Sequence, residues 1–174
     1  MRLFKPDYYV RNFEKINLDR LKKRGIKLLL CDIDNTLVAY NDPDSNAKVK
    51  RFLRDVEAHG IQVALCSNAA PARAKRFARD LDVEKVYYLS FKPLARNMKK
   101  AMRHFHVSPR QTALLGDQLL TDMLGGHLAG VYTILTAPII EKDKLDTRIN
   151  RFFEGFIYRH FEKNNILKKG DFDD

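Results

Sequence analysis

The chain has 174 residues, a length that suits one α/β domain better than two. Hydrophobic residues make up 45% of it, and no apolar run reaches the roughly 18 residues that a membrane-spanning helix needs. The formal net charge of +10 indicates anionic partners, namely a membrane surface, a nucleic acid or a phosphorylated substrate. A basic solvated surface that only aids solubility is the alternative interpretation.

The cysteine content and the N-terminus indicate the compartment. Cys31 and Cys66 stand at the ends of apolar runs and have no second pair, so neither a disulfide framework nor a structural zinc site is expected. The first residues lack the apolar core and small-residue cleavage site of a secretory signal. We therefore expect a cytoplasmic protein.

Strand-like and helix-like segments alternate along the chain. The basic, aromatic segment 1–25 includes a short helix at about 19–24, and a core of about 26–136 follows. Strands are predicted at 26–31, 61–66, 86–89, 112–116 and 131–135. Helices are predicted from Ser45, a candidate cap, to His59, after Pro71, around 94–105 and around 121–128. This alternation predicts an α/β fold, with a parallel sheet and helices on both faces, as one domain over residues 1–174.

An amphipathic helix is predicted at about 145–167. Its apolar stripe comprises Leu145, Ile149, Phe152, Phe153, Phe156, Ile157, His160 and Phe161, and its basic face carries Arg148, Arg151, Arg159 and Lys163. Such a helix either packs its stripe on the core or on a twin subunit, or lies in a membrane interface. The acidic residues Asp171, Asp173 and Asp174 at the end are expected to be disordered.

Polar side chains follow several predicted strands. Asp32 and Asp34 come directly after the first buried strand, where two carboxylates are costly without a counter-ion. Mg²⁺ is the natural one, because it prefers oxygen ligands. A simple turn would explain Asn35 but not two acids that close a buried strand.

The other polar positions are Ser67, Asn68, Lys92, Asp117 and Asp122. The first two could bind a phosphoryl oxygen or merely cap a helix, and the lysine could stabilise charge on a transferring phosphoryl group. Asp117 would complete the cation site, and Asp122 would orient a metal-bound water or Lys92, or else cap a helix. Because the carboxyl ends of parallel strands form the usual ligand site, these residues are expected to converge there.

The order of these pieces resembles the haloacid dehalogenase superfamily. DIDNTL at 32–37 matches its first signature, SNA at 67–69 its second, Lys92 its third and GDQLLTD at 116–122 its acidic fourth. The resemblance spans about 27–135 and implies a three-layer, Rossmann-like fold.

The resemblance also implies roles for these residues. Asp32 would attack phosphorus and form an aspartyl-phosphate, and Asp34 would act as general acid and then general base. Mg²⁺ would be held by Asp32, the carbonyl of Asp34, and Asp117. The phosphoryl group would be bound by Ser67, Asn68 and Lys92, with Thr36 and Asp122 in support.

The short stretches between the motifs leave no room for a cap domain, as in subclass III of the superfamily, so the site should be open to a large substrate. With its basic ends, the chain resembles the YqeG family, which is similar to phosphatidylglycerophosphate phosphatases. This resemblance implies an anionic lipid substrate, phosphatidylglycerol synthesis and a peripheral position on the inner face of the membrane. The alternatives are a phosphatase of a soluble nucleotide or sugar phosphate, a homo-oligomer whose second subunit covers the site, and a nucleic-acid-binding or ribosome-associated protein with an idle site.

Overall fold

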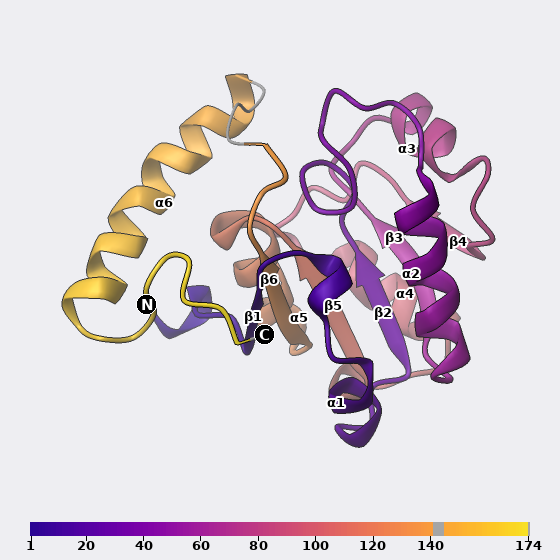
Figure 1. Ribbon diagram of the computed structural model, residues 1–174, viewed down its shortest axis with the longest axis horizontal. Helices are drawn as coiled ribbons and strands as arrows, with labels where there is room; N and C mark the ends of the chain where they lie inside the picture. The colour runs from indigo at the N-terminus through magenta and orange to yellow at the C-terminus, as the bar shows by residue number, and fades with distance from the viewer. Residues whose placement is uncertain (141–144, 174) are drawn as a thin grey trace.

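The computed structural model describes residues 1–140 and 145–173, with the backbone alone at 145–149 and 151. Within these ranges a single parallel sheet has six strands, in the order β1-β6-β5-β2-β3-β4 (Figure 1). The strands are β1 (Tyr8–Val10), β2 (Leu28–Cys31), β3 (Gln62–Cys66), β4 (Lys85–Tyr87), β5 (Thr112–Gly116) and β6 (Tyr132–Thr136). The predicted α/β class with a parallel sheet is confirmed.

Helices cover both faces of the sheet. One face carries α1 (Leu18–Lys23), α2 (Ala47–Ala58) and α3 (Pro71–Ala78), and the other carries α4 (Arg96–His104) and α5 (Leu124–Ala129). Short 3₁₀ helices are η1 (Arg2–Phe4), η2 (Phe13–Lys15) and η3 (Pro109–Gln111), and η4 (Leu119–Met123) is a short π-helix. Within β2, Leu29 packs toward the first group of helices and Leu30 toward the second. This double burial explains why the strand reads as a continuous apolar run.

Two local expectations require correction. The structure adds β1, which pairs with β6 through Tyr9 and Leu135, to the five predicted strands. The cap of α2 is Asn46, whose side chain accepts a hydrogen bond from the backbone N–H of Val49 at 3.1 Å, and not Ser45. Asparagine and serine are both good caps, so sequence alone did not separate these two neighbours.

The C-terminal tail lies along the outer edge of β1. The backbone N–H of Asp173 donates to the carbonyl of Tyr9 at 2.7 Å, and its carboxylate accepts from the Tyr9 N–H at 2.8 Å. The ring of Phe172 packs on that of Tyr9 with centroids 4.7 Å apart. The expectation of disorder is therefore wrong for these residues, because backbone pairing covers the open edge of the sheet. Asp174 lies outside the described residues.

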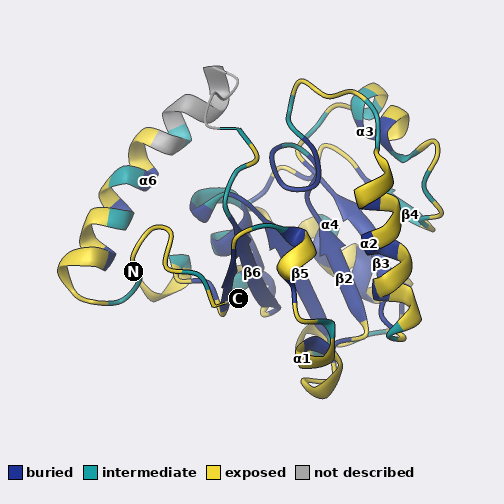
Figure 2. Cartoon of the chain, viewed as in Figure 1, coloured by how far each residue is buried: buried dark blue, intermediate teal, exposed yellow. Residues whose placement is uncertain are grey.

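Helix α6 (Leu145–Lys163) lies at the β1 edge of the sheet (Figure 1). Ile157 and Phe161 are buried against η4 and the strands β1 and β6. Phe152, Phe153 and Phe156 are 64%, 54% and 49% exposed, so the single apolar stripe expected from the sequence is wrong (Figure 2). The side chains of Leu145, Arg148, Ile149 and Arg151 lie outside the described residues. In the described part of the chain, no helix has the length and apolar character needed to cross a bilayer.

Candidate active site

Three acidic side chains converge at the carboxyl edge of the sheet. Asp32 follows β2 and Asp117 follows β5, two neighbouring strands that pair Cys31 with Leu115. The chain leaves β2 and β5 toward opposite edges of the sheet, so these acids stand at the topological switch point. Carboxylate oxygens of Asp32, Asp117 and Asp122 all lie within 4.8 Å of one another, and all three residues are buried.

Lys92 lies between two of these acids. Its Nζ is 2.7 Å from Oδ1 of Asp32 and 2.6 Å from Oδ1 of Asp122. Burial raises the pKa of Asp32 above its usual range, although the ammonium group acts against this shift. Burial alone would lower the pKa of Lys92, but Asp122 and Asp32 outweigh it, so the pKa of the lysine rises and its charge is retained.

Asn68 fixes the backbone at Lys92. Its Oδ1 accepts from the N–H of Lys92 at 2.7 Å, and its Nδ2 donates to the carbonyl of the same residue at 3.2 Å. The carboxamide of Asn68 therefore positions the lysine, and phosphoryl binding by the hydroxyl and backbone amides at positions 67 and 68 stays a prediction. The hydroxyl oxygen of Ser67, at the end of β3, accepts from the N–H of Ala69 at 3.2 Å and lines the pocket beside Asp32.

The turn after β2 places Thr36 against Asp32 and Asp117. Oγ1 of Thr36 lies 3.3 Å from Oδ2 of Asp32 and 3.3 Å from Oδ1 of Asp117, so it contacts two of the converging carboxylates. Asn35 adopts the left-handed region at φ 61°, which asparagine tolerates better than most residues. Asn35 therefore forms a turn, as expected, and this turn does not prevent Asp32 from lying close to Asp117.

Gly116 allows Asp122 to approach the site. A Cβ at position 116 would overlap the carboxyl group of Asp122. The same carboxylate accepts from the N–H of Gln118 at 3.1 Å, which holds it in place while it contacts Lys92. Asp122 therefore orients Lys92, which is one of the three alternatives expected for it from the sequence.

Sequence reasoning missed Arg73, which lies on α3. Its Nε and Nη2 donate to Oδ1 of Asp34 at 3.1 and 2.9 Å, and its Nη1 donates to the carbonyl of Pro43 at 2.8 Å. The side chain of Asp34 therefore pairs with an arginine and is not one of the three clustered carboxylates. No sequence signature marks Arg73, because arginines are frequent throughout this chain.

The charge of the cluster fits a divalent cation. Asp32, Asp117 and Asp122 carry three negative charges and Lys92 one positive charge, an excess of two negative charges in a buried site. Removing this excess from water is costly, and the raised pKa of Asp32 is a sign of that cost. Carboxylate oxygens are suitable ligands for Mg²⁺, so the residues present fit the expected metal.

The two nearby thiols do not compete as nucleophiles. Cys31 precedes Asp32, Cys66 precedes Ser67, and both are free and buried. Burial raises the pKa of each thiol, which keeps it protonated and unreactive. Asp32 remains as the candidate nucleophile.

A pocket of about 280 Å³ opens over these residues. Its lining includes the predicted positions Asp32, Asp34, Ser67, Asn68 and Lys92, together with Ala69, Ala70, Gln118, Thr121 and Asn150. Nδ2 of Asn150, on α6, donates to Oε1 of Gln118 at 3.3 Å, so the C-terminal helix borders the pocket.

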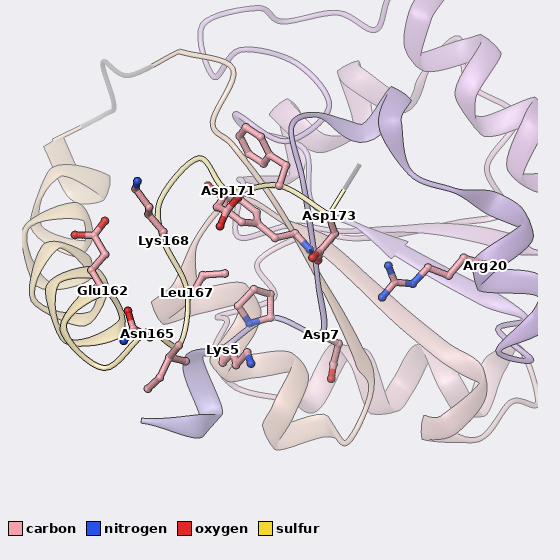
Figure 3. Close-up of a pocket in the computed structure, with 13 residues that line it drawn as sticks. Lys5, Asp7, Arg20, Glu162, Asn165, Leu167, Lys168, Asp171 and Asp173 are labelled. Atoms are coloured by element: carbon pink, nitrogen blue, oxygen red, sulfur yellow. Dashed lines mark hydrogen bonds between the residues drawn. The ribbon is translucent and has the colours of Figure 1, made fainter.

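A larger pocket of about 820 Å³ lies between β1, the end of α6 and the tail (Figure 3). Charges of both signs line it, including Lys5, Asp7 and Glu162, and none of the predicted site residues does. The smaller pocket is therefore the candidate active site.

Comparison with known proteins identifies the family. Residues 1–140 match a family model described as mitochondrial PGP phosphatase. The chain is 35% identical over 153 residues to the probable phosphatase YqeG of Bacillus subtilis (strain 168), covering 88% of each chain. It is 27% identical over 146 residues to phosphatidylglycerophosphate phosphatase 1, chloroplastic/mitochondrial, of Arabidopsis thaliana, covering 77% of this chain and 41% of that protein.

Solved structures support the fold. The cobalt-bound deoxy-D-mannose-octulosonate 8-phosphate phosphatase of Haemophilus influenzae matches with a TM-score of 0.52 at 20% identity, over 65% of this chain and 69% of that one. A probable phosphatase of the YrbI family from Pseudomonas syringae matches with a TM-score of 0.52 at 20% identity, over 69% of this chain and 82% of that one. The chain therefore belongs to the mitochondrial PGP phosphatase family and is a YqeG-like phosphatase.

Proposed function

We propose that this phosphatase removes the terminal phosphate of phosphatidylglycerophosphate at a membrane surface, with Mg²⁺ as its metal. The family model and the name of the Arabidopsis relative support this lipid substrate. The net charge of +10 favours work on anionic bilayers, where each nearby Lys or Arg contributes about 1 kcal/mol to binding.

The contact of Lys92 with Asp32 carries the chemical part of the proposal. In the first step a carboxylate oxygen of Asp32 attacks phosphorus, the bond to the lipid oxygen breaks, and Asp34 protonates the departing alcohol. In the second step Asp34 takes a proton from water, which attacks the aspartyl-phosphate and releases inorganic phosphate. Lys92, held by Asn68 and Asp122, offsets the negative charge of the phosphoryl group.

The metal would be bound by Asp32 and Asp117, with the Asp34 carbonyl as the third protein ligand expected from the sequence. When bound, Mg²⁺ supplies positive charge to the phosphoryl oxygens and balances the excess charge of the carboxylates. Thr36, within hydrogen-bonding distance of both Asp32 and Asp117, fixes the two acids relative to each other.

The open site supports a large substrate. Between Asp34 and Ser67 the chain holds only a loop, α2 and β3, and between Ser67 and Lys92 it holds α3 and β4. The loop before α2 is tied to α3, because Arg76 donates to both carboxylate oxygens of Asp44 at 3.0 and 2.9 Å. No inserted domain covers the pocket in these stretches, so a lipid phosphate can approach from a bilayer.

The first experiment measures phosphate release from vesicles that contain phosphatidylglycerophosphate, with Mg²⁺, for the wild type and Asp32→Asn. Release by the wild type alone is expected. If the wild type releases phosphate only from a soluble aryl phosphate, in an Asp32-dependent manner, the lipid substrate is wrong but the phosphatase chemistry stands. Salt-sensitive RNA binding without any phosphate release would favour the nucleic-acid alternative.

A further inference from the structure

Helix α6 has two distinct faces in the structure. The inner face carries Asn150, Glu154, Ile157 and Phe161, which are spaced four, three and four residues apart. These residues contact η4, Gln118 and the strands β1 and β6. Ile157 and Phe161 are buried, and the carboxylate of Glu154 accepts from the N–H of Leu120 at 3.1 Å. These contacts fix the rotation of the helix about its axis.

The outer face repeats the same spacing two residues later. Phe152, Phe156, Arg159 and Lys163 follow one another at intervals of four, three and four residues, so they form one stripe on the side opposite the core. All four are exposed, as is Phe153 beside them (Figure 2). The rings of Phe153 and Phe156 each make an edge contact with that of Phe152, at centroid distances of 5.7 and 5.1 Å.

The charge on this outer face is positive. The guanidinium of Arg159 lies 4.5 Å from the ring centroid of Phe156, and Lys163 follows one turn later. Among the α6 acids whose side chains the structure describes, Glu154 is buried on the inner face and Glu162 lines the pocket beside the tail (Figure 3). Over these described side chains, the phenylalanine stripe carries cations and no acid, which makes it complementary to an anionic lipid interface.

Helix α6 also borders the candidate active site. Asn150, on the inner face, lines the candidate pocket, and Phe156 lies on the outer face six residues later, about 9 Å further along the helix axis. A surface that binds the phenylalanines therefore contacts the same helix that borders the pocket containing Asp32.

We propose that the outer face of α6, formed by Phe152, Phe153, Phe156, Arg159 and Lys163, docks onto an anionic bilayer and brings the pocket to its phosphate groups. The proposal rests on the proposed function, because it assigns the lipid surface to a specific element. The phenylalanines bury their rings at the level of the lipid headgroups, and the two cations contact the lipid phosphates. The occupant is the bilayer and not a second copy of the chain, since two copies would bring the cations of both helices together.

The test measures partition onto vesicles made of equal parts phosphatidylcholine and phosphatidylglycerol, with no substrate present. Replacing Phe152, Phe153 and Phe156 together by Ser is expected to lower partition at least roughly tenfold, because each ring loses its buried apolar area. The charge variant Arg159→Gln/Lys163→Gln is also expected to bind roughly 25-fold less, from about fivefold for each cation. Partition of the wild type should fall with salt and on vesicles of phosphatidylcholine alone.

A matched control uses Leu128 on α5, which is 53% exposed but stands outside α6. Leu128→Ser should bind vesicles as the wild type does, and an equal loss in this variant would overturn the assignment to α6. The proposal is also overturned if replacement of Phe91 and Leu94, which are 64% and 63% exposed in the loop around Lys92, abolishes binding while the α6 variant binds normally.

Two further readouts separate this inference from the proposed function. The triple serine variant should hydrolyse a soluble aryl phosphate at the wild-type rate, because its changes lie outside the pocket. If the wild type binds anionic vesicles through α6 but releases no lipid phosphate, the docking surface stands and the substrate is wrong. If the wild type does not bind vesicles and sediments as a dimer, and the triple serine variant sediments as a monomer, the outer face is an interface between copies and the proposal fails.

Discussion

Two nitrogen atoms of Arg73 donate hydrogen bonds to the same carboxylate oxygen of Asp34, at 3.1 and 2.9 Å. The third nitrogen of the guanidinium is anchored on the carbonyl of Pro43. Such a two-point attachment fixes the direction of the carboxylate better than a flexible lysine would. Asp34 is the proposed acid and base, so Arg73 is a positioning residue for both proton transfers.

Replacing Arg73 by Met should lower kcat by about tenfold, because Asp34 loses its fixed direction relative to the leaving oxygen and the attacking water. If Arg73 acts through Asp34, the double variant with Asp34→Asn should be no slower than Asp34→Asn alone. Steady-state phosphate release from a soluble alkyl phosphate checks this double-mutant cycle. Losses that multiply in the double variant would show that Arg73 acts independently of Asp34.

Mg²⁺ should raise the midpoint of thermal unfolding of the wild type, because a cation that binds only the folded state stabilises it. The excess of two negative charges around Lys92 is the physical reason. Asp117→Asn removes one ligand and should remove most of this shift, while a chelator should stop turnover of the wild type. The control Asp80→Asn alters an acid that is largely exposed, and should keep the full shift. An unchanged shift in Asp117→Asn would place the metal elsewhere.

The sequence predicted the elements whose signals are local and strong. The strand at Thr112–Gly116 matches β5 residue for residue, because its apolar run ends sharply at a glycine and an acid. Asp32 and Asp117 were expected to meet for a topological reason, since parallel strands end at a common edge. The proximity of these two residues could therefore be predicted without any knowledge of side-chain contacts.

Features that depend on long-range contacts could not be predicted. β1 has only three residues and owes its strand conformation to pairing with β6 and to the tail at position 173. On α6, Phe152, Phe153 and Phe156 are exposed whereas Ile157 and Phe161 are buried. Which of them are buried depends on the side of the helix that packs on η4, and the sequence does not reveal this side because both faces are aromatic. Arg73 contacts Asp34 across a separation of 39 residues, which no spacing rule indicates.

Gly116→Ala should impair both folding and catalysis. The added Cβ would overlap the carboxyl group of Asp122, which would have to move away from Lys92. Overpacking of this kind costs about 1–3 kcal/mol in the free energy of unfolding. Urea unfolding measures this cost, and phosphate release measures the effect on Lys92. For comparison, Gly155→Ala on α6 meets no atom within 4 Å and should have neither effect. Equal behaviour of the two variants would show that Asp122 does not need the space at Gly116.

Phe172→Ala tests whether the tail stabilises the open edge of the sheet. The ring of Phe172 packs on Tyr9, and the guanidinium of Arg11 lies 5.4 Å from its centroid. Loss of these contacts should lower the free energy of unfolding by about 1–2 kcal/mol. Phe153→Ala makes the same chemical change at an exposed position of α6 and should alter stability by less than about 0.5 kcal/mol. If both variants lose the same stability, the ring of Phe172 makes no specific contribution to the stability of the β1 edge.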